Sequence, residues 1–276
     1  MDRSSFSEVS GTYKYSAMRT ASVLERSFVM LPGVGRRTEQ SLWRQGISDW
    51  DAFLSAQNVC GISAARLESL REHVCAIRDL EAVGKLRELG GLLPSGERWR
   101  LLRSWDSRFA AMDIEVVRVG HAIRPVMVSL LRGQQDCITL IRGDDLTWKN
   151  LGKALSGVDF LVTFNGSSFD LPILIENGFP ADGPMQLDLR RYAARSGLPG
   201  GLKYIEGKLG IRRPREMEFS TSEQVSYLWR IWEERGGKNA LDLLTSYNRC
   251  DTSSLVRLAE EIYSRLSREL LRKASC

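Results

Sequence analysis

Short apolar runs in the second half of the chain predict a β-sheet. The predicted strands cover residues 109–117, 125–131, 137–141, 158–164 and 185–189. The polar stretch 132–136 has a length typical of an antiparallel hairpin connection. Helices are predicted between the later strands, over residues 147–155 and 169–177.

Helical periodicity continues to the end of the chain after residue 189. The predicted helices cover residues 190–196, 201–209, 221–235, 239–249 and 251–272. Three strands, then alternating helices and strands, then helices alone, are typical of an α/β domain with one mixed central sheet flanked by helices. We expect this domain to span residues 108–276.

The N-terminal part of the chain has a different pattern. Residues 1–20 are polar and are expected to form a flexible lead-in. A short helix is predicted over 21–30, and the turn Leu31–Gly35 separates it from a helix that runs through Gln45. Two glycines in this turn allow a tight bend and leave backbone N–H groups at the start of the second helix, where they suit a phosphate.

This pattern resembles the helix-hairpin-helix motif, which implies contact with DNA or RNA. Gly33 and Gly35 would provide the backbone donors, and Arg36 and Arg37 follow directly and would reinforce a phosphate contact. The alternative is a helical packing unit that touches no nucleic acid.

A degenerate second copy of the motif is expected after the first. Val59–Ile62 precedes Ser63, which is a suitable N-cap for a helix to about Arg78. Together the two copies predict a small all-α domain over residues 21–80, and the Gly-rich stretch 81–107 is interpreted as a connector.

Composition narrows the choice of partners and compartment. The net charge of +5 and the pI of about 9.0 permit a nucleic-acid partner. The chain has no apolar run long enough to predict a membrane span, and its N-terminus lacks the layout of a secretion signal. The five cysteines are scattered without a C-x-x-C pair, which is typical of reduced thiols. We therefore expect a cytoplasmic protein without membrane contact.

Positive charge is concentrated between Arg190 and Arg215, where Glu206 is the single acidic residue. Within this run, three candidates for contact with a phosphate backbone are Lys203, Arg212 and Arg213. The alternative interpretation is a solvated surface without a partner.

Two carboxylates interrupt the apolar strand predicted over 109–117. Side chains alternate along a strand, so Asp113 and Glu115 are expected to stand side by side on one face. Neighbouring carboxylates repel each other and lose hydration unless positive charge lies between them. The chain has only two histidines, which argues against a His/Cys zinc site. A hard divalent cation held by carboxylate oxygens is therefore predicted.

Further candidate residues follow later in the chain. Asp170 comes after the strand 158–164 and a short turn. Tyr247 and Asp251 are four residues apart, and on a helix such positions share a face. Asp188 is another acidic residue at a strand end, and no catalytic role is assigned to it.

The order D-x-E, N-x-x-x-F-D and Y-x-x-x-D resembles the DEDDy 3′–5′ exonucleases of the ribonuclease H-like superfamily. Residues 97–276 are more similar still to bacterial and archaeal ribonuclease H-like domain proteins. The blocks that carry this likeness are Trp99-Arg100-Leu101, Asp113-Ile114-Glu115, residues 164–172, Leu187-Asp188-Leu189, Leu202–Ile211 and Tyr247–Asp251. Each motif is short, and the specificity of the likeness comes from their common order.

The resemblance implies a mixed sheet with the site on its carboxylate-bearing strand. It makes Asp113, Glu115, Asp170 and Asp251 the metal-binding residues, and Tyr247 the residue that orients the attacking water. Two Mg²⁺ or Mn²⁺ ions are implied, because such a pair stabilises both the entering and the leaving oxygen of phosphodiester cleavage. The implied activity is release of nucleoside monophosphates from the 3′ end of DNA or RNA.

The chain departs from the family pattern directly after the acidic pair. Related chains continue with small polar residues and glycine, whereas Val116, Val117 and Arg118 follow here. That segment would approach the terminal nucleotide, so we expect a changed substrate channel. His121, just beyond it, is interpreted as a loop or surface residue rather than a catalytic one.

Two other functions remain open from the sequence. The first is a nucleic-acid-binding protein that uses a catalytically inactive nuclease fold as a scaffold. The second is another metal-dependent phosphoesterase, including a structure-selective endonuclease on the same fold. The sequence favours neither DNA nor RNA as the substrate.

Overall fold

A five-stranded mixed sheet lies at the centre of the computed structural model, which describes residues 22–103, 105–179, 182–214 and 222–275. Its strands are β1 (Phe109–Val119), β2 (Ala122–Arg132), β3 (Ile138–Ile141), β4 (Phe160–Thr163) and β5 (Met185–Asp188). The strand order is β3-β2-β1-β4-β5. Strand β2 is antiparallel to both of its neighbours, whereas β1, β4 and β5 run parallel. The predicted α/β architecture is confirmed, with β1 in the middle of the sheet.

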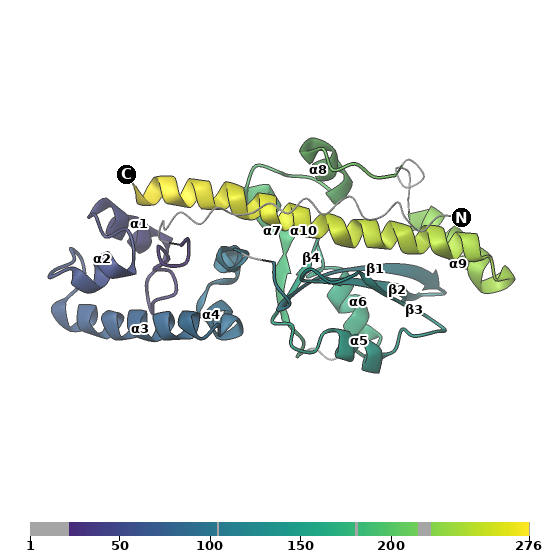
Figure 1. Cartoon of the computed structure of the whole chain (residues 1–276), viewed down its shortest axis with the longest axis horizontal. Coiled ribbons are helices and arrows are strands. Elements are labelled where there is room, and N and C mark those ends of the chain that lie inside the picture. Colours follow the sequence, from purple (N-terminus) through teal and green to yellow (C-terminus); the bar gives the residue numbers. More distant parts are fainter. Residues whose placement is uncertain (1–21, 104, 180–181, 215–221, 276) are drawn as a thin grey trace.

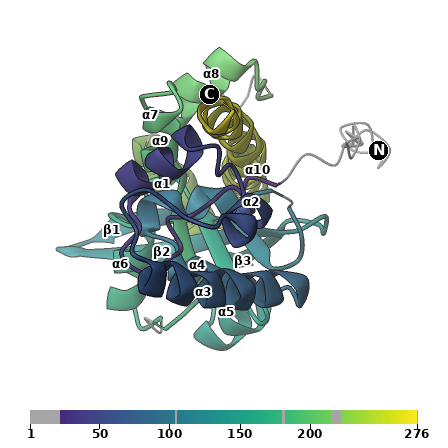
Figure 2. The same cartoon turned by 90° about the vertical axis from the view of Figure 1, so that its left-hand side faces the viewer.

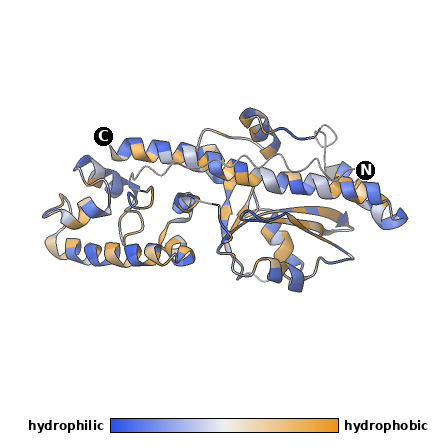
Figure 3. Ribbon diagram, in the orientation of Figure 1, coloured by the Kyte–Doolittle hydropathy of each residue, from blue (hydrophilic) through white to orange (hydrophobic). Residues whose placement is uncertain are grey.

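Helices cover both faces of this sheet (Figures 1 and 2). On one face lie α5 (Trp148–Ala154) and α6 (Asp170–Glu176), and on the other lies α10 (Lys238–Ala274). Beside α10 lie α7 (Leu189–Arg195), α8 (Leu202–Leu209) and α9 (Ser222–Arg235). The strands are largely apolar, while α10 alternates apolar and hydrophilic positions along its length (Figure 3). This is the pattern of an amphipathic helix that packs one face on a sheet.

The last helix is longer than the sequence pattern predicts. The two helices expected over 239–249 and 251–272 form one continuous helix of 37 residues. The split was wrong because residues 238–274 contain neither glycine nor proline, the two residues that most disfavour a helix interior. At about 1.5 Å per residue, α10 is about 55 Å long. It therefore contacts β1 and β2 near its start and the N-terminal helices near its end (Figure 1).

The N-terminal part is helical, as predicted for most of its length. It contains α1 (Arg36–Arg44), α2 (Trp50–Ser55), α3 (Ala64–Ala82), α4 (Leu86–Leu92) and the 3-10 helix η1 (Ser95–Leu101). Ser63 caps α3 by accepting a hydrogen bond from the Arg66 N–H, as expected. The segment interpreted as a connector contains both α4 and η1. Residues 1–20 lie outside the described residues.

The helix expected over residues 21–30 is wrong, because the described residues of this segment form turns. Side chains of α1 and α2 form hydrogen bonds with its backbone, in place of the regular backbone hydrogen bonds of a helix. The Glu39 carboxylate accepts hydrogen bonds from the N–H groups of Phe28 (2.8 Å) and Val29 (3.3 Å). The indole N–H groups of Trp43 and Trp50 donate to two of its carbonyl oxygens. An irregular backbone is thereby satisfied without a helix.

A buried ion-pair network joins the N-terminal helices to the sheet domain. The Arg100 guanidinium donates to both Glu39 oxygens, at 2.8 and 2.9 Å, and its Nε donates to Glu97 at 2.8 Å. Each of these three side chains is only 2% exposed. Glu97 also pairs with Arg36 of α1 and with Arg195 of α7. Side chains from α1, η1 and α7 therefore meet in one ion-pair network, whose central residues are Glu39, Glu97 and Arg100.

The part of the chain that the structure describes contains no helix both long and apolar enough to cross a membrane.

Replacing Arg100 with Met tests the importance of this network. The substitution leaves Glu39 and Glu97 buried without their main counter-charge, so we expect the free energy of unfolding to fall by about 3–5 kcal/mol. Urea denaturation followed by circular dichroism gives this value. Lys273→Ala, which breaks the exposed pair with Glu269, is the control and should cost no more than about 1 kcal/mol. Equal losses in the two variants would contradict a structural role for the network.

Candidate active site

The alternation of side chains along β1 places its two carboxylates on the face covered by α10. Ala111 packs in the core shared with α10, whereas Met112 packs in the core shared with α5 and α6. Asp113 and Glu115 follow Ala111 at steps of two, so they point toward α10. Glu115 is 9% exposed and Asp113 is half-buried.

The ladder between β1 and β2 is interrupted just beyond the acidic pair. Asp113 is paired with Ser129 and Glu115 with Met127, but the next residue, Val116, is paired with Pro125. Val126 is therefore an extra residue on β2, which makes a β-bulge. Bulges bend a strand and change the direction of the side chains that follow. The strand thus changes course at the point where the carboxylates end.

Helix α10 brings three polar side chains to the same place. Tyr247 and Asp251 are one helical turn apart, as predicted, and Asn248 lies between them in sequence. The Asn248 side-chain amide donates to Asp113 Oδ2 at 2.6 Å, which joins the helix directly to β1. Tyr247 and Asp251 are each 8% exposed and Asn248 is fully buried.

Asp170 is the first residue of α6 and is presented by the turn that follows β4. Asp188, at the end of β5, holds this turn by accepting hydrogen bonds from the Asn165 N–H (2.8 Å), the Ser167 N–H (3.2 Å) and the Ser167 hydroxyl (2.5 Å). Asn165 has a φ of 66°, a left-handed conformation that Asn tolerates better than most residues. A Cβ on Gly166 would clash with the Thr163 side chain. The turn that positions Asp170 therefore depends on particular residue types.

Desolvation raises the pKa of all four carboxyl groups, and for Asp113 and Glu115 the charges of other members of the group add to it. For Asp113, desolvation is the main cause, followed by the charges of Asp251, Glu115 and Asp170. Desolvation, together with Asp251, raises the pKa of Glu115 to about 8. Desolvation raises the pKa of Asp170 to about 7, against hydrogen bonding to the backbone of Asp170 and Ile114. Desolvation also raises the pKa of Asp251, and the nearby Arg213 offsets this only in part.

Two basic residues of the predicted phosphate-binding run reach this cluster. Arg213 forms an ion pair with Asp251, and Lys203 lowers the pKa of Glu115 and of Asp251. The Lys203 ammonium lies 5.1 Å from the centroid of the Tyr247 ring. Desolvation, followed by the charge of Asp251, raises the pKa of the Tyr247 hydroxyl, so this residue stays protonated at neutral pH.

The other candidates lie elsewhere. Arg212 is exposed on the surface after α8, and Arg215 lies outside the described residues. The candidates for nucleic-acid contact at the N-terminal end of α1 are all exposed. They are Gly33, Gly35, Arg36 and Arg37. That helix lies at the far end of α10 from β1 (Figure 1). His121 is exposed in the turn between β1 and β2, in agreement with its interpretation as a surface residue.

Three site residues have structural roles that the sequence did not assign. Asn248 contacts Asp113, Asp188 holds the turn before Asp170, and Glu206 binds Arg213. Asn248 stands beside Tyr247 on the same helix, and that proximity was the available signal. The pairing of Glu206 with Arg213 has no comparable signature, because it depends on how the chain folds back after α8.

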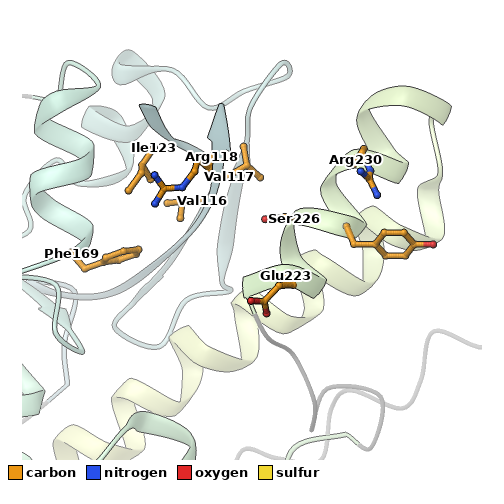
Figure 4. A pocket seen from close by; sticks show the side chains of 9 residues that line it. Val116, Val117, Arg118, Ile123, Phe169, Glu223, Ser226 and Arg230 are labelled. Carbon is orange, nitrogen blue, oxygen red and sulfur yellow. The ribbon is translucent and has the colours of Figure 1, made fainter. Parts of the chain in front are cut away.

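A cavity of about 520 Å³ lies between the ends of β1 and β2, the start of α6 and helix α9. Its walls are formed by Val116, Val117, Arg118, Ile123, Phe169, Glu223, Ser226, Tyr227 and Arg230. Figure 4 shows Arg118 and Phe169 on the side of the sheet, and Glu223, Ser226 and Arg230 across the cavity on α9. Two of the lining residues are neighbours of the carboxylates in sequence, because Val116 follows Glu115 and Phe169 precedes Asp170.

The carboxylate oxygens of Asp113, Glu115, Asp170 and Asp251 are the type of ligand that a hard divalent cation prefers. Neighbouring carboxylates add to the desolvation that raises the pKa of Asp113 and Glu115, and Mg²⁺ and Mn²⁺ prefer such oxygen ligands. Asp251 Oδ1 is buried and, among the described residues, accepts no hydrogen bond of normal geometry. As the described side chains stand, no three His, Cys, Asp or Glu residues are close enough together to hold an ion. Ion binding would therefore require the carboxylates to draw closer.

The raised pKa values predict how the stability of the metal-free protein depends on pH. A carboxyl group whose pKa is higher in the folded state stabilises the fold below its unfolded pKa, about 4.3 for Glu, and this contribution is lost as the pH rises through the folded value. For Glu115 the loss should occur between about pH 4 and pH 8. Glu115→Gln should therefore be more stable than the wild type at pH 8 by at least about 1 kcal/mol, with a smaller difference at pH 5.

Urea unfolding in EDTA at both pH values measures this effect. Glu72→Gln, on the exposed surface of α3, is the matched control and should leave the pH dependence unchanged. If Glu115→Gln gave the same stability difference at pH 5 and pH 8, Glu115 would not be part of a desolvated acidic cluster.

Comparison with known proteins is in accord with this fold. The RNase_H superfamily matches residues 126–263, half of the chain, which include Asp170, Tyr247 and Asp251 and begin after Asp113 and Glu115. No curated protein matches the chain.

Two solved structures show a more distant likeness. A family B DNA polymerase from the hyperthermophilic archaeon Pyrobaculum calidifontis is 18% identical, with a TM-score of 0.46 over 61% of this chain, and the match covers 27% of the polymerase. The EXO domain of Aedes aegypti Nibbler is 15% identical, with a TM-score of 0.34 over 64% of this chain and 88% of that domain. Because the family match covers half of the chain, the chain belongs to the RNase_H superfamily.

Proposed function

We propose that the protein is a two-metal-ion-dependent nuclease, and specifically a 3′–5′ exonuclease that hydrolyses DNA or RNA to nucleoside monophosphates. The observation that carries this proposal is the group of four carboxylates between β1, α6 and α10, whose desolvation and repulsion call for divalent cations. Membership of the RNase_H superfamily supports a nucleic-acid hydrolase.

The residues of the site divide into ligands and positioning groups. The ligands of the two ions would be Asp113, Glu115, Asp170 and Asp251. When bound, such ions lower the pKa of the attacking water and stabilise the entering and leaving oxygens. Tyr247 stays protonated, so its hydroxyl can hold the attacking water by hydrogen bonding without adding charge. The Lys203 ammonium lies over the Tyr247 ring and lowers the pKa of Glu115 and Asp251, and at this place it can bind a phosphate oxygen.

The cavity beside the site suits the end of a nucleic-acid strand. Phe169, 42% exposed, lies on its wall and offers a surface on which a base can stack. Arg118 and Arg230 add positive charge near the phosphates. Bulky Val116 and Val117 occupy the place where related chains have small residues, and this supports a substrate channel particular to this chain.

The N-terminal helices supply a second contact with nucleic acid in this proposal. Gly33 adopts a φ of 68° and Gly35 precedes α1, as a tight turn before a phosphate-binding helix requires. Arg37 is exposed beside this turn, whereas Arg36 is engaged by Glu97.

A second candidate function is a nucleic-acid-binding protein with an inactive nuclease fold. One observation favours it, because Asp251 is paired with Arg213 and the described carboxylates do not come together as an ion site. In that case the turn at Gly33 and Gly35 and the basic run that begins at Arg190 would bind nucleic acid in the absence of divalent ions.

An assay with end-labelled single-stranded and duplex DNA and RNA tests the proposed activity. With Mn²⁺ or Mg²⁺ we expect mononucleotides released from the 3′ end, and no product in EDTA. Asp113→Asn keeps the shape of the side chain but removes a ligand charge, so it should reduce the rate at least about 100-fold, the scale of losing a metal-site partner. Glu72→Gln, distant from the site, should retain full activity.

The products also distinguish the alternatives. Discrete fragments instead of mononucleotides would indicate an endonuclease on the same fold. No degradation, together with salt-sensitive binding in EDTA that Arg37→Ala weakens, would contradict the nuclease and support the inactive binding protein.

A further inference from the structure

Arg213 is held firmly by Glu206. Its Nε donates to Glu206 Oε2 and its Nη2 to Glu206 Oε1, both at 2.7 Å. The exposed fraction of the side chain is 7% for Arg213 and 3% for Glu206. Two parallel hydrogen bonds from a planar guanidinium to a carboxylate fix its position as well as its charge. Arg213 is therefore an anchored cation rather than a mobile surface arginine.

The third nitrogen of this guanidinium is directed at the active site. Arg213 Nη1 forms an ion pair with Asp251 Oδ1, and the guanidinium carbon lies 5.7 Å from the centroid of the Tyr247 ring. Within the part of the chain that the structure describes, Asp251 is the one site carboxylate paired with a cationic side chain. Asp113 is bound by the neutral Asn248 amide instead.

This arrangement has a direct electrostatic consequence. A desolvated carboxylate requires a counter-charge, and the guanidinium provides it for Asp251. A divalent ion that bound the same carboxylate would meet the positive charge of Arg213 at close range. Two cations that share one oxygen repel each other, so one of them has to withdraw.

We propose that Arg213 and a divalent ion compete for the carboxylate of Asp251, and that Glu206 keeps Arg213 next to the site during this exchange. This inference rests on the proposed metal site and adds to it the order in which the two ions bind. Ion binding through Asp113, Glu115 and Asp170 displaces no cation, whereas ion binding through Asp251 displaces Arg213. The two ions therefore bind with unequal affinity, and the weaker one depends on Arg213.

The exchange also gives Arg213 a use after it leaves Asp251. Its Nη1 becomes available to donate to a phosphate oxygen, while Nε and Nη2 remain on Glu206. This agrees with the interpretation of Arg213 as a nucleic-acid contact within the basic run.

Calorimetric titration of the full chain with Mn²⁺, without nucleic acid, tests the competition. For the wild type we expect one tighter and one weaker ion. The double variant Glu206→Gln/Arg213→Gln removes both members of the pair and leaves the net charge unchanged, so Glu206 is not left as an unpaired buried carboxylate and Asp251 is released for the ion. In this variant the weaker ion should bind at least about tenfold more tightly, the scale of a charge-assisted hydrogen bond, while the tighter ion is unchanged.

Two controls separate this competition from a general loss of positive charge. Lys203→Gln removes a charge that acts on Glu115 and Asp251 but is not paired with Asp251. It should change the weaker affinity much less than the double variant does. In an Asp251→Asn background, the double substitution should have no further effect, because the contested carboxylate is gone. Circular dichroism and urea unfolding verify that each variant is folded.

The outcomes distinguish this inference from the proposed function. Equal Mn²⁺ affinities in the wild type and the folded double variant, or equal tightening by Lys203→Gln, would overturn the competition and leave the metal site intact. No Mn²⁺ binding by any of these proteins would overturn the metal site, and the competition with it.

Discussion

The candidate site depends above all on four carboxylates held in a desolvated space. Asp113 and Glu115 on β1, Asp170 on α6 and Asp251 on α10 come from three elements far apart in the sequence, yet each has a raised pKa. A fold gains no stability from such a group, because each charge loses hydration and meets like charges. Its presence in a packed interior is therefore an argument for function, and perturbed ionisable groups next to a cavity are typical of active sites.

The remainder of the fold holds these charges in place. Helix α10 carries Tyr247, Asn248 and Asp251 over β1 and then continues to the N-terminal helices. The network around Arg100 joins those helices to η1 and α7. The N-cap residue of α7 is Asp188, which holds the turn before Asp170. The N-terminal part and the strands of the carboxylate site thus share one hydrophobic core.

Much of the sheet could be predicted from the sequence, because strand formation follows local apolar patterning. The alternation along 109–117 was sufficient to predict that Asp113 and Glu115 share a face. The helical spacing of Tyr247 and Asp251 was equally local. Prediction failed where side chains distant in the sequence determine the conformation of the backbone. The segment after residue 21 is irregular because Glu39, 10 and 11 residues further along the chain, binds the N–H groups of Phe28 and Val29.

The same limit applies to the site itself. Arg213 was predicted to contact nucleic acid from its place in a basic run, but charge patterning does not reveal which carboxylates an arginine meets. Its pairs with Glu206 and Asp251 exist because the chain after α8 folds back over α10. Composition could indicate a divalent ion, whereas the competition for Asp251 required the positions of all three side chains.

In the proposed function, the four carboxylates form one divalent-metal site. A crystal structure of the protein grown with Mn²⁺, with the ions located by anomalous scattering, tests it most directly. We expect Mn²⁺ between β1, α6 and α10, bound by Asp113, Glu115, Asp170 and Asp251, with Arg213 withdrawn from Asp251. Absence of Mn²⁺ from this space at saturating concentration, with Arg213 still paired to Asp251, would contradict it.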